Sequence, residues 1–168
     1  MNRIISAIIA ASALIFGVFM PGEKAVAQTA NELVGTWTLV SSTLEKDGKT
    51  TDFYGPNPMG QVTFGADGRF LSLITRSDLP KFVSNNRVEG TPEENKAVVQ
   101  GSIAFFGTYL VSDTDKIFTV HIESCTFPNW NGTERKEYFS ISGDELHFTS
   151  LSKDSAGGTD HLVWKRAK

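Results

Sequence analysis

Most of the chain after residue 28 consists of short segments in which apolar and polar residues alternate, each followed by a turn signal. The turn signals contain glycine beside small polar residues, as in Asp47-Gly48, residues 65–68 and Ser142-Gly143-Asp144. Alternation with a period of two is typical of half-buried strands, and turns this short join neighbouring antiparallel strands. The pattern predicts at least eight strands, at residues 37–41, 49–53, 61–64, 69–75, 106–111, 116–124, 134–141, 145–151 and 160–166.

A meander of this length leaves two unpaired edge strands unless it closes on itself. We therefore predict an all-β fold, an antiparallel up-and-down β-barrel of about eight or more strands. One helix interrupts it, because Thr91-Pro92-Glu93-Glu94 has the spacing of a capping box with proline at the first helical position. The helix should run from Pro92 to about Gln100 and plug or cover one end of the barrel.

The amino-terminal segment differs from the rest of the chain. Arg3 is the only charged residue before an apolar run that ends at Met20, and Ala25-Val26-Ala27 forms a small-x-small triplet. These features are typical of a secretory signal peptide cleaved after residue 27, with an uncleaved anchor as the alternative. We expect residues 28–168 to form one barrel domain that is exported, periplasmic or secreted, with no membrane span after cleavage.

Charge and cysteine content limit the possible partners. A net charge of −3 in 168 residues leaves no basic surplus for phosphates, so a nucleic-acid partner is not expected. Cys125 is the only cysteine and cannot form an internal disulfide, and we expect it to be a buried, inert thiol. The histidines are isolated and no phosphate-binding glycine loop occurs, so neither a metal nor a cofactor is expected.

The segment Asn31-Glu32-Leu33-Val34-Gly35-Thr36-Trp37 resembles the opening of a lipocalin-type barrel, with its Gly-x-Trp at the start of the first strand. The resemblance implies structural roles for Gly35, Trp37 and Arg166, with Trp37 closing one barrel end and Arg166 lying over its ring. Further stretches resemble bacterial and fungal lipocalin-like domain proteins across nearly all of residues 28–168: Pro58-Met59-Gly60, Asp67-Gly68-Arg69-Phe70, residues 90–94, Phe106-Gly107-Thr108-Tyr109, residues 127–133 and Val163-Trp164-Lys165-Arg166. This resemblance implies a calycin-type barrel and no particular activity.

His121 and Glu123 are candidate catalytic residues. They lie two apart on one strand and therefore share a face, while Phe118, Val120 and Ile122 share the other. If the apolar face points inward, His121 and Glu123 lie in solvent. If the barrel has a polar cavity, the carboxylate could orient the imidazole as an acid–base pair.

Two loops are longer than a meander requires, residues 76–90 and 125–133. Long loops in compact domains often bind ligands, and aromatic side chains at a barrel mouth suit a small, largely apolar molecule. We expect Arg76, Tyr109, His121, Phe127 and Trp130 to contact the ligand. Alternatively, the loop aromatics pack beneath their own loops, and Arg76 pairs with Asp78 or Glu89.

Three functions are compatible with the sequence. The first is an exported lipocalin-like barrel, a monomer or weak homodimer, that binds a small apolar or amphipathic molecule in its interior. The second is a cofactor-independent enzyme on the same barrel, an isomerase, cyclase or hydrolase using His121, Glu123, Tyr109 or Arg76. The third is a packed barrel that acts through its surface. Because a barrel interior hosts ligand binding or catalysis, the fold does not decide between the first two.

Overall fold

A computed structural model describes residues 31–112 and 114–168; the predicted signal peptide, residues 1–27, lies outside the described residues. The strands are β1 (Gly35–Lys46), β2 (Lys49–Thr51), β3 (Met59–Phe64), β4 (Arg69–Thr75), β5 (Ser102–Ser112), β6 (Ile117–Cys125), β7 (Glu134–Ser142), β8 (Glu145–Ser150) and β9 (Thr159–Arg166). Helix α2 spans Pro92–Gly101, and the 3-10 helix η1 spans Pro128–Trp130.

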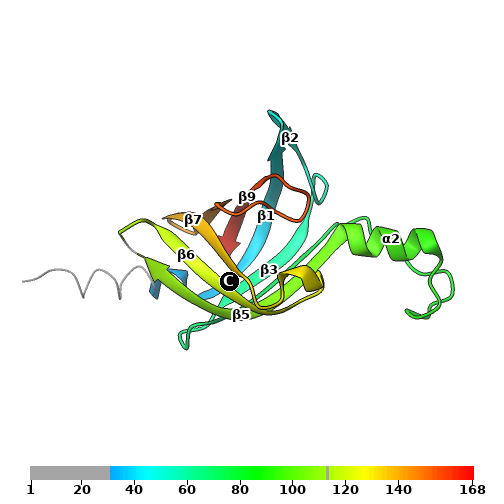
Figure 1. The fold of residues 1–168 in the computed structure, drawn as a ribbon, viewed down its shortest axis with the longest axis horizontal. Coiled ribbons are helices and arrows are strands. Elements are labelled where there is room, and N and C mark those ends of the chain that lie inside the picture. Colours follow the sequence, from blue (N-terminus) through cyan, green and yellow to red (C-terminus); the bar gives the residue numbers. More distant parts are fainter. Residues whose placement is uncertain (1–30, 113) are drawn as a thin grey trace, which may run out of the picture.

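The strands form one closed antiparallel barrel (Figure 1). Each strand from β3 to β9 pairs with its sequence neighbour, and β1 pairs with both β3 and β9, so the two edges of the meander meet. Eight strands make the barrel, and the short β2 pairs only with the end of β1. The predicted all-β up-and-down barrel is confirmed.

One barrel end is closed by Trp37, the end that holds the start of β1 and the end of β9. The Trp37 side chain is fully buried, and its Nε1 donates a hydrogen bond to Leu33 O at 2.8 Å. The Arg166 guanidinium lies 4.0 Å from the centroid of the indole and donates to Val34 O and Glu32 O. Gly35 has φ of +126°, and a Cβ there would lie 3.2 Å from Arg166 Nη1. Glycine therefore supplies both the backbone conformation and the space that the guanidinium needs.

Aromatic rings fill the interior next to this closed end. Phe64 packs edge-on against Tyr109 and Phe118, with ring centroids 5.0 and 5.6 Å apart. The Tyr109 hydroxyl donates to Gly65 O at 3.0 Å, so the phenol is satisfied by the β3–β4 turn. These rings fill much of the interior beside Trp37, and Phe64 and Phe118 also border an internal cavity.

Helix α2 forms where the capping box predicts it. Thr91 accepts from Glu94 N, and the Glu94 carboxylate accepts from Thr91 N and from Val83 N. The helix does not plug the barrel, however, because it projects away from the end of the barrel beyond β5 (Figure 1). Most of its residues are exposed, so it buries too little apolar surface to cover a barrel end. Only its carboxyl end reaches the mouth, where Arg76 N donates to Gly101 O.

Replacement of Arg166 by Met should lower the free energy of unfolding by about 2 kcal/mol, because the cation–π contact and two hydrogen bonds to backbone carbonyls are lost. Lys165→Met is the matched control, since Lys165 is the exposed neighbour on the same strand. Urea unfolding followed by tryptophan fluorescence measures both variants. Equal stability of the two would show that Arg166 does not hold the closed end.

Candidate functional site

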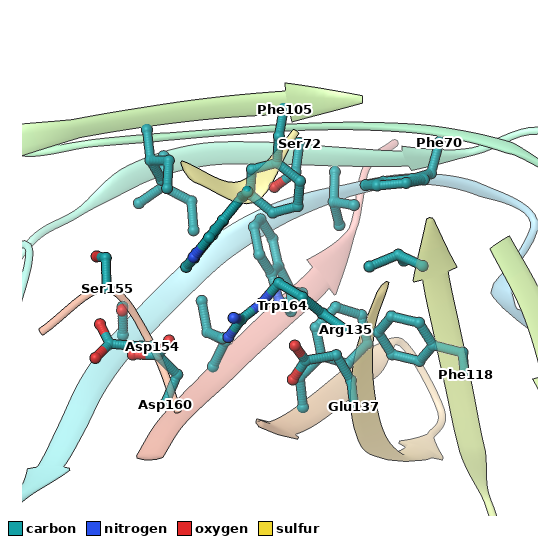
Figure 2. A pocket seen from close by; sticks show the side chains of 18 of the residues that line it. Phe70, Ser72, Phe105, Phe118, Arg135, Glu137, Asp154, Ser155, Asp160 and Trp164 are labelled. Atoms are coloured by element: carbon teal, nitrogen blue, oxygen red, sulfur yellow. The ribbon is translucent and has the colours of Figure 1, made fainter. Parts of the chain in front are cut away.

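An internal cavity of about 80 Å³ lies in the barrel, and Trp37 is not among the residues that line it (Figure 2). Its lining comes from all eight barrel strands and from Tyr54, Trp130 and the β8–β9 connection, residues 151–158. Two small inward-facing side chains, Ser42 on β1 and Ser72 on β4, are 2% and 4% exposed. They occupy positions where larger residues would close the space.

One wall of the cavity is apolar and largely aromatic. It belongs to β3, β4, β5 and β6, which lie side by side in the sheet. The residues are Val62, Phe64, Phe70, Ile74, Ile103, Phe105, Phe118 and Val120. This wall has no charged side chain and suits the carbon skeleton of a ligand.

The opposite wall carries charge. Arg135 and Glu137 face inward from β7, where they share a face with the buried Phe139. Asp160 faces inward from β9, and Asp154 comes from the β8–β9 connection. Figure 2 shows these four side chains together on one side of the cavity, facing Phe70, Ser72 and Phe105 on the other. The cavity is therefore amphipathic across its width.

Arg135 is held in place by the protein itself. Its guanidinium lies 4.0 Å from the centroid of Trp130 and donates to Lys153 O, Ser150 Oγ and Ser152 O at 3.0, 3.3 and 3.4 Å. The Arg135 guanidinium thereby anchors the β8–β9 connection through hydrogen bonds to its backbone carbonyls.

Two carboxyl groups of the charged wall, those of Glu137 and Asp160, have raised pKa values. Burial raises the pKa of Glu137 to about 8, with a smaller increase from Asp160, while Arg135 and Ser150 oppose the shift. Burial also raises the pKa of Asp160 to about 7, and Asp154 adds to this increase while Arg135 opposes it. Each of these carboxyls therefore keeps its proton to a higher pH than an exposed carboxyl does.

Three buried polar atoms of the cavity lining have no hydrogen-bond partner within the described residues: Ser42 Oγ, Glu137 Oε2 and Trp164 Nε1. Trp164 and Ser42 are 1% and 2% exposed, so bulk water does not reach them freely. A buried polar atom without a partner destabilises the fold by about 1–3 kcal/mol. All three therefore favour an occupant of the cavity, water or ligand, that supplies donors and acceptors.

A larger hollow of about 660 Å³ lies outside the cavity, and we call it the mouth hollow. It shares Tyr54, Ile103 and Ser155 with the cavity, so the two spaces adjoin. The rest of its lining is mostly apolar or polar without charge: Phe53, Val98, Val99, Gln100, Ser102, Thr126, Phe127 and Ala156, together with Arg76. The carboxyl end of α2 thus forms part of the route into the barrel.

His121 and Glu123 lie outside the cavity, on the outer face of β6, which corrects their assignment to a catalytic or ligand-contacting site inside the barrel. The side chains of Phe118, Val120 and Ile122 take the interior, and both candidates are exposed. Glu123 forms an ion pair with Arg69 at 2.8 Å, and the arginine holds the pKa of Glu123 below its usual range. The apolar face of the strand points inward because burying it gives the larger gain in free energy.

The other residues proposed for ligand contact are distributed over different parts of the fold. Trp130 lines the cavity, whereas Phe127 and Arg76 line the mouth hollow. Arg76 is paired with Asp78 at 2.8 Å, which is the alternative that the sequence left open. Tyr109 packs at the closed end and is not among the residues that line the cavity.

Sequence reasoning did not identify Arg135, Glu137, Asp154 or Asp160. The available signal is on β7, where two charged residues share a face with Phe139 and Ile141. Charged residues at positions that alternation assigns to the interior indicate a polar cavity. Asp154 lies in a connection with no periodicity, and only the fold brings it beside β7.

Among residues 31–112 and 114–168, no group of three or more His, Cys, Asp or Glu side chains could hold a metal ion. Within the same residues, no helix has the length and apolar character needed to cross a bilayer. Cys125 is a buried free thiol, and burial raises its pKa.

Glu137→Gln should make the protein more stable at pH 9, by an amount on the order of 2 kcal/mol, because the buried carboxyl no longer has to ionise. The pKa of Glu137 is higher in the folded state than in the unfolded state. At pH values between the two, the folded protein therefore binds more protons than the unfolded chain. The favourable contribution of Glu137 to the free energy of unfolding is therefore fully present at acidic pH and is lost as the pH rises through about 8. Chemical denaturation between pH 5 and 9 measures this difference.

The matched control is Glu134→Gln, which removes an exposed carboxylate from the outer face of the same strand. Its stability should follow that of the wild type at every pH. If Glu137→Gln also follows the wild type, Glu137 does not ionise in a buried environment.

Comparisons with known proteins place these features in a family. Residues 34–167 match the lipocalin-like domain. Similar solved structures include an uncharacterized protein from Bacteroides eggerthii, with 16% identity, a TM-score of 0.41 and coverage of 80% of this chain and 99% of that chain. They also include a mutant of the fluorescent protein UnaG, with 12% identity, a TM-score of 0.38 and coverage of 82% and 97%. No curated protein matches. Because the family match spans most of the sequence, the chain belongs to the lipocalin-like domain family.

Proposed function

We propose that the protein is an exported lipocalin-like barrel that binds a small amphipathic molecule in its interior. The observation that supports this most is the division of the cavity into an aromatic wall and a charged wall. A ligand with a polar group at one end would satisfy the buried polar atoms, and its carbon skeleton would pack against the aromatic wall. An entirely apolar ligand would leave Glu137 Oε2 and Trp164 Nε1 unpaired.

The sizes of the two spaces suggest how such a ligand lies. The cavity of about 80 Å³ is well below the ~300–1,000 Å³ of typical small-molecule pockets, so it accommodates a head group rather than a whole ligand. The mouth hollow of about 660 Å³ has room for the remainder. We therefore propose that the polar group enters first and that the carbon skeleton extends past Tyr54 and Ile103 to the mouth.

The other two functions, a packed barrel that acts through its surface and a cofactor-independent enzyme, explain fewer features of the cavity. A packed barrel that acts through its surface does not require a cavity lined by unpaired polar atoms. A cofactor-independent enzyme remains the second candidate, and its acid and base would be Glu137 and Asp160. Their pKa values of about 8 and 7 suit proton transfer at neutral pH.

Ser72→Phe should abolish ligand binding, because the new ring extends from β4 into the cavity that the serine leaves open. The matched control is Leu73→Phe, which places the same ring on the outer face of the same strand. Native mass spectrometry of protein purified from the export compartment should show a bound small molecule in the wild type and in Leu73→Phe, and the bare mass in Ser72→Phe. Near-ultraviolet circular dichroism checks that each variant is folded.

The bare mass for the wild type, together with no thermal shift across a panel of small amphipathic compounds, would overturn the proposed function. Retention of the small molecule by Ser72→Phe would place its site outside the cavity.

Export predicts a defined amino terminus. Cleavage after Ala27 leaves a chain that begins at Gln28, and mass measurement of the purified protein should find that terminus. Replacing both Ala25 and Ala27 by Glu should leave the precursor uncleaved, since signal peptidase requires small residues at these positions. A wild-type protein that retains Met1 to Ala27 would contradict cleavage.

A further inference from the structure

We propose that the cavity selects its ligand by a cationic group, namely the protonated amine of a small amphipathic molecule that also carries a hydrogen-bond acceptor. Glu137 and Asp160 would hold the ammonium, and the Trp164 indole N–H would donate to the acceptor. This inference rests on the proposed small-molecule binding function and specifies its ligand.

The first argument is the excess of carboxyl groups over cations among the residues that line the cavity. Glu137, Asp154 and Asp160 face a single cation, Arg135. Arg135 is already engaged by the Trp130 ring and by loop oxygens. Asp154 is engaged too, because its Oδ1 accepts from Ala156 N and Gly158 N at 2.8 and 3.0 Å. Free acceptor capacity is left on Glu137 and Asp160 and on the second oxygen of Asp154, and a cationic donor complements it.

The second argument is the set of buried polar atoms without partners. Glu137 Oε2 can accept a hydrogen bond, Trp164 Nε1 can only donate, and Ser42 Oγ can do either. Two of these residues, Trp164 and Ser42, are at least 98% buried and line the cavity. They point to a ligand that offers both a donor and an acceptor, such as an amino alcohol.

The third argument is the aromatic surface next to Glu137. In the barrel register Glu137 lies opposite Phe118, whose ring centroid is 4.7 Å from that of Phe148. Phe148 in turn packs against Trp164. An ammonium held by a carboxylate among aromatic faces gains cation–π attraction that a neutral or anionic group does not. The same cavity already pairs Arg135 with Trp130 in this way.

The groups around Glu137 determine how binding depends on pH. On its own strand it faces Arg135, and from β9 and the β8–β9 connection it faces Asp160 and Asp154. Tyr54 lines the cavity toward the mouth, and burial raises its pKa so that it stays neutral. The cavity residues of the neighbouring strands β6 and β8, namely Phe118, Val120 and Phe148, do not titrate.

Ammonium binding should therefore release protons. Burial favours the protonated forms of Glu137 and Asp160 when no cation is bound. A bound cation favours their ionised forms, so its affinity should rise between pH 6 and 8 as fewer protons have to be displaced. A neutral ligand should show no such rise in affinity.

Three probes with one skeleton test the inference: 2-amino-1-phenylethanol, the neutral 1-phenylethane-1,2-diol and the anionic mandelate. Isothermal titration calorimetry with the intact protein should give an affinity for the amine at least about tenfold above that for the diol, with mandelate weakest. Titrations in two buffers of different ionisation enthalpy should show proton release with the amine only.

Glu137→Gln keeps the shape of the side chain. It should lower the affinity for the amine by about tenfold and leave the affinity for the diol unchanged. Proton release should fall in the same variant. Glu134→Gln, which changes the outer face of the same strand, should behave as the wild type. Asp160→Asn provides a second variant should Glu137→Gln not fold, and it should likewise reduce affinity for the amine alone.

Equal affinities for the amine and the diol, or tightest binding of mandelate, would overturn the cationic ligand while leaving small-molecule binding in place. Binding of none of the three probes would also overturn it. The bound-molecule measurement on wild type and Ser72→Phe then decides separately whether the proposed function stands. A high-resolution structure with only water on Glu137 Oε2 in the presence of the amine would likewise refute the proposal.

Discussion

The pairing of β1 with β9 is the constraint on which the rest of the structure depends. It joins β1 to the last strand, so the eight barrel strands form a closed sheet and their inward faces enclose one interior. Trp37 and Arg166 lie on these two strands and close the same end that the pairing creates. Aromatic rings pack beside Trp37, and the mouth hollow adjoins the cavity through Tyr54, Ile103 and Ser155.

The buried carboxyl groups of the charged wall lower the stability of the barrel when they ionise. Burying Glu137 and Asp160 raises the pKa of both groups, which means that their ionised forms destabilise the native state. Replacing such groups by apolar residues of similar volume commonly stabilises a protein. The barrel tolerates them because the aromatic half and the continuous strand pairing supply the stability. Arg135 does not neutralise them fully, since its hydrogen bonds are directed to the β8–β9 connection.

The barrel can be predicted from the sequence because the signals for strands and turns are local. Alternation and glycine turns depend only on neighbouring residues, and the capping box at Thr91 fixes the start of α2 to the residue. The sequence does not predict which residues meet across the barrel. Arg135 and Asp154 are brought together by the β7–β8 register and by a connection with no periodic pattern. The prediction that α2 covers a barrel end is wrong for a related reason. The cap shows where the helix begins, and nothing in the local sequence shows the direction in which it leaves the barrel.

The position of the cavity follows from side-chain size. At the closed end the inward positions of β3 and β5 carry Phe64 and Tyr109, which fill the space between the strands. Toward the mouth, inward positions on β1 and β4 carry Ser42 and Ser72, which do not. The hydrogen-bonded strand pairing does not depend on these two side chains, so the fold and the cavity are encoded by different residues. Relatives with the same barrel can therefore differ in what they bind, and membership of the lipocalin-like domain family determines the architecture without determining the ligand.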